Sequence, residues 1–189
     1  MAKQRISYVA PDAVTDPKMR AEIERSVRVG TPRAESQAVR AHVPAVFWSF
    51  VNAWNDVFID GVLDHDLKEL CRVYVAQSVK CEYCASQRSE KSKNLGTVEE
   101  DFRELLNFEK TERFDGRTKA ALALTEAITW DLDADDALWQ RLHDHFTEPE
   151  IVELGFFVGL TMGQQRFNRT LNLDQHLGQT GFEAGAANS

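Results

Sequence analysis

The stretch KCEYCASQRS at residues 80–89 places two of the chain's three cysteines, Cys81 and Cys84, in a Cys-x-x-Cys motif. Two thiols at this spacing can close a disulfide reversibly when they lie at the start of a helix. The unpaired N–H groups and the dipole of a first helical turn lower the pKa of a thiol placed there. The motif therefore predicts redox chemistry, with metal ligation and plain core packing as its alternatives.

The composition of the 189 residues is that of an ordinary globular protein, with 43% hydrophobic and 28% charged residues. The length suits one well-cored domain, with or without an appended arm. A formal net charge of −8 argues against nucleic acid as a partner, because an acidic surface repels phosphate. No apolar run approaches the roughly 18 residues of a membrane span, and no signal-peptide core follows the N-terminus. We therefore expect a cytoplasmic protein. In a reducing compartment a close cysteine pair indicates a redox or metal-binding function more often than a structural disulfide.

Apolar residues recur at intervals of three and four through most of the chain, and the sequence lacks hairpin turns between alternating runs. This pattern predicts an all-α fold. Residues 1–34 are expected to form an N-terminal arm and a helix that Asp16 caps and Pro17 opens. Residues 35–176 are expected to form one compact helical domain, and residues 177–189 a flexible tail.

Capping residues and glycines predict where the helices of this domain begin and end. The expected boundaries are a break near His42 and Val43, a stop at Asp60-Gly61 with Gly61 in the left-handed conformation, starts at Asp64, Asp115, Asp133 or Asp135, and Thr147, and a capping box from Thr97 to Glu100. The apolar run 151–173 predicts a long helix that is central or lies at a subunit contact.

The relation of Glu69 to the cysteines depends on whether the helix between them is interrupted. Glu69 lies twelve residues before Cys81, which on one straight helix is about 18 Å. A break at residues 78–80 would start a new helix at the cysteines and let Glu69 fold back towards them, although neither Gly nor Pro is present there. Otherwise Glu69 is most simply half of a surface ion pair with Lys68 or Arg72.

Several segments together resemble the carboxymuconolactone decarboxylase superfamily, in its alkylhydroperoxidase D-like branch. They are LKEL at 67–70, VAQ at 75–77, CEYC at 81–84 and KAALALTEA at 119–127, and the resemblance covers roughly residues 40–175. It implies an all-helical subunit that assembles as a homo-oligomer, either a trimer or a hexamer. It also implies that a small-molecule peroxide is reduced by the cysteine pair and that an external dithiol is the reductant, with no organic or metal cofactor.

The resemblance implies that Cys84 attacks the peroxide and Cys81 resolves the product, with Glu69 as the carboxylate of a proton relay. The helix start alone favours the opposite order, because Cys81 lies nearer to it. Both orders stay open on the sequence.

The supporting residues expected around the pair are Tyr83, Gln87 and Arg88. The resemblance places a histidine where this chain has Arg88, four residues after Cys84. An arginine cannot accept a proton at neutral pH, but one helical turn from Cys84 it could stabilise a thiolate. Arg88 equally suits an ion pair with Glu82 or Glu69, and Gln87 could help to hold water.

Other side chains with chemical potential have simpler interpretations. Cys71 lies on an apolar stripe and is expected to be a buried free thiol. His42 and His65 flank helix starts and are expected at caps or on the surface, and His143 and His145 are expected to be solvated, without metal spacing to the cysteines. The aromatic set Phe47, Trp48, Phe50, Trp54 and Phe58 is either core or the lining of a pocket for an organic hydroperoxide.

The expected function is that of a cysteine-dependent, peroxidase-like oxidoreductase that cycles through a Cys81–Cys84 disulfide. The alternative is an oligomeric helical protein that binds a partner or senses redox state without peroxidase turnover, which the missing relay histidine favours. Lactone decarboxylation is disfavoured by the cysteine pair.

Overall fold

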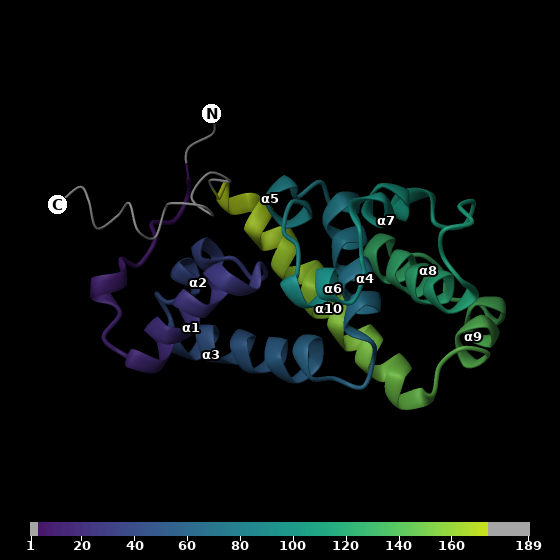
Figure 1. The fold of residues 1–189 in the computed structure, drawn as a ribbon, viewed down its shortest axis with the longest axis horizontal. Helices are drawn as coiled ribbons and strands as arrows, with labels where there is room; N and C mark the ends of the chain where they lie inside the picture. The colour runs from purple at the N-terminus through teal and green to yellow at the C-terminus, as the bar shows by residue number, and fades with distance from the viewer. Residues whose placement is uncertain (1–3, 174–189) are drawn as a thin grey trace.

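A computed structural model describes residues 4–173, and every regular element within that range is a helix (Figure 1). The α-helices are α1 (Pro17–Val29), α2 (Ala34–Arg40), α3 (Pro44–Ala53), α4 (His65–Ser78), α5 (Glu82–Ala85), α6 (Glu90–Asn94), α7 (Glu99–Glu104), α8 (Gly116–Trp130), α9 (Asp136–His143) and α10 (Glu148–Leu171). A π-helix, η2 (Trp54–Ile59), continues α3, and short 3₁₀ helices lie at Pro11–Ala13 and Leu105–Asn107. The predicted all-α class is thus confirmed, and the tail expected at 177–189 lies outside the described residues.

Helix α4 is the centre of the fold because it packs against both α8 and α10, which also pack against each other. In Figure 1, α10 runs diagonally across the molecule, with α4 and α8 beside it. Small residues of α8, Ala120 and Ala121, are fully buried and let α4 approach closely. The buried apolar side chains of α4 are Leu67, Leu70, Cys71, Val73, Tyr74, Val75 and Ala76. This packing fixes α4, the helix that carries Glu69.

The N-terminal arm and α1 pack against α2 and α3 through a smaller apolar cluster. Its buried members are Val14, Met19, Ile23, Ala34, Phe47 and Val51. As the sequence predicts, Asp16 caps α1 by accepting from the N–H of Lys18 at 2.8 Å. Gly30 ends the helix with φ +80°. The arm is also tied to the rest of the chain, because the N–H of Val9 donates to the carbonyl of Ala38 at 3.1 Å.

Most of the predicted helix starts are confirmed. Pro44 opens α3 directly after the predicted break. The N-caps of α4, α8 and α9 are Asp64, Asp115 and Asp135, and Thr147 forms a capping box with Glu150 at the start of α10. These starts depend on bonds between residues at most four apart, so a local sequence signal suffices.

Gly61 does follow the end of a helix, but the left-handed conformation predicted for it is wrong. A Cβ at this position would lie 2.3 Å from Oε1 of Glu153 and 2.4 Å from the carbonyl oxygen of Val57. Glycine is therefore required here for close approach. The free space lets Glu153 accept from the N–H groups of Val62 and Leu63 and pair with the buried Lys68 at 2.8 Å.

The capping box predicted from Thr97 to Glu100 is shifted by one residue. Val98 is the N-cap of α7, and its N–H donates to Asp101 at 2.8 Å. The hydroxyl of Thr97 instead forms a hydrogen bond with Ser92 at 2.7 Å. The competing contact to α6 therefore decides where α7 begins.

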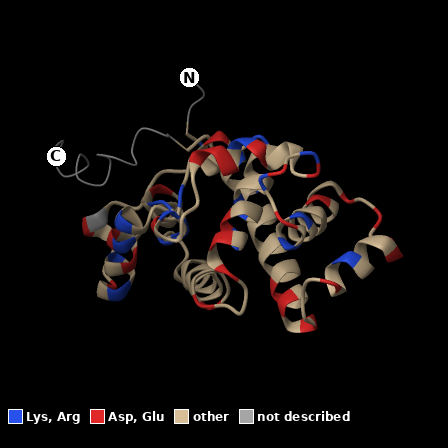
Figure 2. Cartoon of the chain, turned by 45° about the vertical axis from the view of Figure 1, so that its right-hand side comes forward, with Lys and Arg blue, Asp and Glu red and all other residues tan. Residues whose placement is uncertain are grey.

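Charged side chains of both signs are interspersed along the helices, whereas α3 carries none (Figure 2). Within residues 4–173, none of the helices is both long enough and apolar enough to cross a membrane.

Candidate active site

A sharp reversal between α4 and α5 brings the cysteines back towards the body of α4. Lys80 adopts the left-handed conformation, with φ +55°, and the N–H of Cys81 donates to the carbonyl of Ala76 at 2.9 Å. Of the two alternatives that the sequence left open, the break at residues 78–80 is the one that the structure has. It lacks a Gly or Pro signal because a lysine takes the conformation that usually favours glycine.

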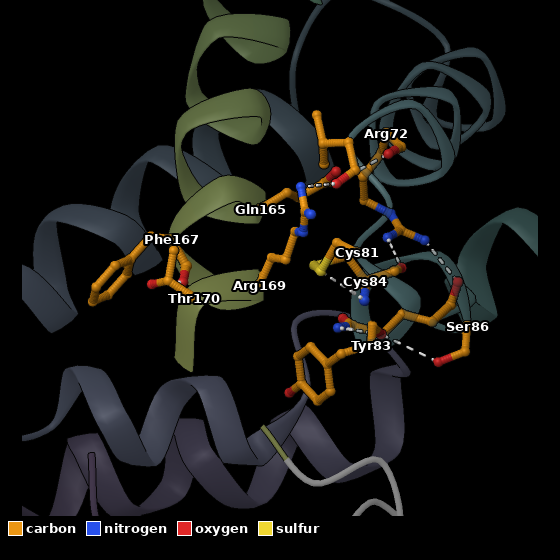
Figure 3. Close-up of a disulfide and its surroundings, with 11 residues drawn as sticks. Arg72, Cys81, Tyr83, Cys84, Ser86, Gln165, Phe167, Arg169 and Thr170 are labelled. Carbon is orange, nitrogen blue, oxygen red and sulfur yellow. Dashed lines mark hydrogen bonds between the residues drawn. A yellow bond between two sulfur atoms is a disulfide. The ribbon is translucent and has the colours of Figure 1, made fainter. Parts of the chain in front are cut away.

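Cys81 and Cys84 form a disulfide at the start of α5, with their Cα atoms 5.2 Å apart (Figure 3). Each residue is only 2% exposed. The N–H of Cys84 points at Sγ of Cys81, with the nitrogen at 3.3 Å. A donor in this position favours negative charge on the Cys81 sulfur once the disulfide is reduced.

Glu69 and Arg72 form a bidentate ion pair that is shielded from water. Arg72 Nε lies 2.6 Å from Glu69 Oε2 and Nη2 lies 2.8 Å from Oε1, and the side chains are 2% and 0% exposed. Of the partners considered for Glu69, Arg72 is therefore correct and Lys68 is wrong, and the pair is buried rather than on the surface. Its geometry is that of the strongest protein ion pairs.

The same ion pair holds the cysteine segment against α4. Arg72 donates from Nη1 to the carbonyl of Cys84 at 3.0 Å and from Nη2 to that of Gln87 at 2.7 Å. Glu69 Oε1 also accepts from the N–H of Ser89 at 2.9 Å. Glu69 is thus brought to the cysteines as predicted, but its connection to Cys84 runs through Arg72.

Arg88 has a different partner from those predicted. Its guanidinium donates to both carboxylate oxygens of Glu99, at 2.7 and 2.9 Å, and lies 4.2 Å from the ring centroid of Phe102. The pair lowers the pKa of Glu99. The expected ion pairs with Glu82 or Glu69 are wrong, because the guanidinium pairs with Glu99 of α7 instead.

His65 is buried, so its expected place at a cap or on the surface is wrong. Its Nδ1 lies 2.8 Å from the carbonyl of Phe58 and its Nε2 lies 2.7 Å from Oγ of Ser89. Burial lowers the pKa of His65, so the ring is neutral. A carbonyl can only accept, so Nδ1 carries the proton and Nε2 accepts from the Ser89 hydroxyl. His65 precedes Glu69 by four residues on one helix face, which is the sequence signal that could have identified it.

Tyr83 and Gln87 have different surroundings. The hydroxyl of the buried Tyr83 donates to Glu35 at 3.2 Å, towards α2. Burial raises the pKa of Tyr83 well above its ordinary value, so the phenol is neutral. Gln87 donates to the carbonyl of Tyr83 at 3.3 Å and lies on the wall of a cavity beside Cys84.

This cavity, of about 30 Å³, meets Cys84 and is not lined by Cys81. Several distant parts of the chain form its wall, through Arg40 of α2, Trp54 of η2, Arg72 of α4, and Thr161 and Gln165 of α10. Figure 3 shows Gln165 on the α10 side of the disulfide, donating to the backbone carbonyl of Arg72 at 3.0 Å. Of the aromatic set, Phe50 and Trp54 line this cavity, whereas Phe47 and Phe58 are core.

The remaining cysteine and the other histidines stand apart from this site. Cys71 is a fully buried free thiol, as predicted, and burial raises its pKa to about 12. His143 and His145 are exposed. In the part of the chain that the structure describes, no group of three or more His, Cys, Asp or Glu side chains could hold a metal ion.

These features define an all-helical protein with a buried Cys-x-x-Cys disulfide fastened to a central helix by a glutamate–arginine pair. Residues 44–127, from α3 into α8, match the model of the Carboxymuconolactone decarboxylase family. This segment contains both cysteines and Glu69, and the resemblance found in the sequence is confirmed.

The chain is also similar to one curated relative, the uncharacterized protein YdfG of Bacillus subtilis. The two are 26% identical over 94 residues, which is 49% of this chain and 64% of the relative. The chain thus matches somewhat less than two thirds of that protein's length.

Solved structures of low sequence identity share the fold. The debrominase Bmp8 in complex with 2,3,4-tribromopyrrole superposes with a TM-score of 0.74 at 13% identity, over 97% of this chain and 99% of that one. An uncharacterized peroxidase-related protein from Ralstonia eutropha JMP134, with an alkylhydroperoxidase AhpD core, gives 0.72 at 16% identity, over 92% and 93%. A peroxidase-related protein from Silicibacter sp. TM1040 gives 0.72 at 17%, over 92% and 94%. The AhpD-like fold therefore includes the N-terminal helices.

Proposed function

We propose that the protein is a thiol-dependent oxidoreductase that reduces a small peroxide and cycles through the Cys81–Cys84 disulfide. The observation that carries this proposal is a cavity that reaches Cys84, one of the two cysteines of the disulfide. An oxidant can approach Cys84 there, while Cys81 lies behind it in disulfide range. The peroxidase-related names of two structural neighbours support the same chemistry.

The reaction needs both thiols and one external reductant. The Cys84 thiolate attacks one peroxide oxygen, the O–O bond breaks, and the released oxygen takes a proton to leave as an alcohol or water. The Cys81 thiolate then attacks the sulfur of the Cys84 sulfenic acid, and the hydroxide that leaves takes a proton to become water as the disulfide forms. Two electrons have passed from the thiols to the peroxide. A dithiol returns them by thiol–disulfide exchange.

The proton relay is a further part of the proposal. Glu69 would serve as its carboxylate, as in the family pattern, although both of its oxygens accept hydrogen bonds from Arg72 and Ser89. The neutral ring of His65 joins the same network through the Ser89 hydroxyl. In this proposal His65 supplies the basic imidazole of the relay. The family pattern has its histidine at the position that Arg88 occupies in this chain.

The test follows free thiols and intact mass while the reduced protein is titrated with hydrogen peroxide or a bulky organic hydroperoxide. A Cys71→Ser background serves as the control, because it removes the third thiol without touching the pair. In Cys81→Ser we expect a trapped sulfenic acid on Cys84. Disulfide formation no faster than oxidation of free dithiothreitol would end the peroxidase proposal, and a sulfenic acid found only on Cys81 would reverse the two roles.

A protein that binds a partner or senses redox state is the second candidate. It is favoured by Arg88, whose guanidinium is engaged by Glu99 and Phe102 and leaves no base at the family's relay position. Such a protein would oxidise once but turn over slowly with excess dithiol. Because one structural neighbour is a debrominase, 2,3,4-tribromopyrrole belongs among the electron acceptors tried.

The homo-oligomer, as a trimer or a hexamer, belongs to the proposal too. Three apolar side chains of α10, Val152, Phe156 and Phe167, are 71%, 54% and 47% exposed and offer a surface for a second copy. Light scattering coupled to size exclusion measures the mass directly. A monomeric mass at the concentrations used for activity would rule the assembly out.

A further inference from the structure

The cavity beside Cys84 contains a buried positive charge without a counter-ion. Arg40 is 6% exposed, and its guanidinium donates to the side-chain oxygens of Gln37 and Gln164, each at 3.0 Å. Its Cζ lies 3.6 Å above the ring centroid of Phe50. Among residues 4–173 no carboxylate forms an ion pair with it, and burial lowers its pKa only to about 10, so it is cationic at neutral pH. A buried charge of this kind is costly unless something pairs with it.

The other arginine on the cavity wall is different. Arg72 is neutralised by the bidentate pair with Glu69, and its remaining donors go to backbone carbonyls. The net positive charge of the cavity therefore comes from Arg40. An anion that entered would meet an unbalanced guanidinium on one side and Cys84 on another.

Three further polar atoms on the same wall have no hydrogen-bond partner among the described residues. They are Nε1 of Trp54, Oγ1 of Thr161 and Oε1 of Gln165, in residues that are 5%, 1% and 5% exposed. Folded proteins leave few buried polar atoms unpaired, so a cluster around one cavity points to a missing ligand. The indole N–H and the threonine hydroxyl can donate to an oxyanion. Trp54 also begins the π-helix η2, a type of helix that is frequent at functional sites.

We propose that this cavity binds a small, singly charged oxyanion, with Arg40 as its counter-ion and Trp54 and Thr161 as hydrogen-bond donors. The inference rests on the proposed function, for which it names the substrate class: a small hydroperoxide that carries a separate carboxylate group, such as hydroperoxyacetate. A volume of about 30 Å³ admits roughly two water-sized groups, which fits a head group of a few heavy atoms. The anionic group orients the oxidant and takes no part in the electron transfer to Cys84.

The binding test uses formate and its neutral counterpart formamide on the oxidised protein, in which the disulfide cannot turn over. We expect formate to bind saturably and formamide at least tenfold more weakly, measured by calorimetry or by ligand NMR. Arg40→Gln should weaken formate binding by roughly tenfold to a hundredfold, the usual cost of a lost charged hydrogen bond. Arg103→Gln is the control, since it also removes one positive charge but from a side chain that is 72% exposed on α7.

Two milder variants keep the test decisive if Arg40→Gln does not fold. Trp54→Phe keeps the ring and Thr161→Val keeps the shape, and each removes one donor, so each should weaken formate binding severalfold. Equal binding of formate and formamide would overturn the inference. So would equal losses in Arg40→Gln and Arg103→Gln, or unchanged binding in both milder variants.

A kinetic comparison separates this inference from the proposed function. Thr161→Val should slow disulfide formation by hydroperoxyacetate, above the pKa of its carboxylic acid, severalfold more than disulfide formation by hydrogen peroxide. Equal slowing would overturn the substrate class while leaving the thiol chemistry intact. Formate binding without any disulfide formation would leave the anion site standing and end the peroxidase proposal.

Discussion

Replacing Glu69 by glutamine tests whether the buried ion pair with Arg72 fastens the cysteine segment to α4. Glutamine has nearly the same shape, so the main change is the loss of the negative charge. Arg72 then remains 2% exposed with no carboxylate. Removing one partner of a buried pair costs about 3–5 kcal/mol. For a chain of this size each kcal/mol shifts the Tm by about 2–4 °C, so the expected drop is roughly 6–20 °C.

The assay is thermal unfolding for the Tm and urea unfolding for the free energy, both on the oxidised protein and followed by tryptophan fluorescence at pH 7 and at one protein concentration. Glu100→Gln is the matched control, because it breaks an exposed i,i+3 pair with Arg103 at 3.1 Å. Exposed pairs of this kind contribute little, so the control should change the free energy of unfolding by about 0.5 kcal/mol or less.

A double-mutant cycle with Arg72→Met separates the pair from its surroundings. The double variant contains no charge at either of these two positions, so we expect the two single losses to exceed the double loss by about 2–3 kcal/mol. The carbonyls of Cys84 and Gln87 lose their donor in both Arg72 variants, and that loss cancels in the cycle. Single losses that add to within about 0.5 kcal/mol would refute the coupling, as would a Glu69→Gln cost no larger than that of the exposed control.

Three other outcomes follow from the structure. Cys71 should resist iodoacetamide in the folded oxidised protein and react after unfolding, because it is fully buried and burial raises its pKa to about 12; alkylation of the folded protein, seen by intact mass, would contradict this. Hydrogen bonds from the N–H of Thr147 and from Arg117 lower the pKa of Glu150 from 4.5 to about 2. Its contribution to stability is therefore complete above about pH 4.5 and lost towards pH 2, so the Tm deficit of Glu150→Gln should shrink over that window rather than stay constant. Gly61→Ala should cost about 1–3 kcal/mol in urea unfolding, because its Cβ would overlap a Glu153 oxygen, and an unchanged midpoint would show that the side chain moves freely.

Features decided by neighbours in sequence were predictable. Asp16, Asp115 and Thr147 cap helices by accepting from or bonding to groups two or three residues away, and those signals are visible in a single sequence. The spacing of the cysteines and of Glu69 is local enough to reveal the family. The burial of Cys71 followed from its place on an apolar helical stripe.

Features decided by distant residues were not predictable. Position 61 requires glycine because a Cβ there would overlap the side chain of Glu153, which lies ninety-two residues later in the chain. The residues next to Gly61 in the sequence do not indicate that contact. Arg88 pairs with Glu99 because the turn after α6 brings α7 beside it. His65 is buried because Ser89 and Phe58 approach it from separate segments.

The same distinction between local and distant contacts applies to the residues of the candidate site. The cysteine pair and Glu69 could be named from one stretch of sequence. Arg40 and Gln165 could not, because they reach the cavity from α2 and α10, which enclose the cysteines only in the folded chain.

The composition of the cavity wall also has a consequence for how such proteins can diversify. The segment that matches the family, residues 44–127, contains both cysteines of the disulfide. Arg40, Thr161 and Gln165 lie outside it, on either side in the sequence. A recombinant fragment cut at the family boundaries would therefore keep the thiols and lose much of the wall around them. Conversely, substitutions confined to α2 and α10 could change which molecule reaches Cys84 while the redox motif stays the same.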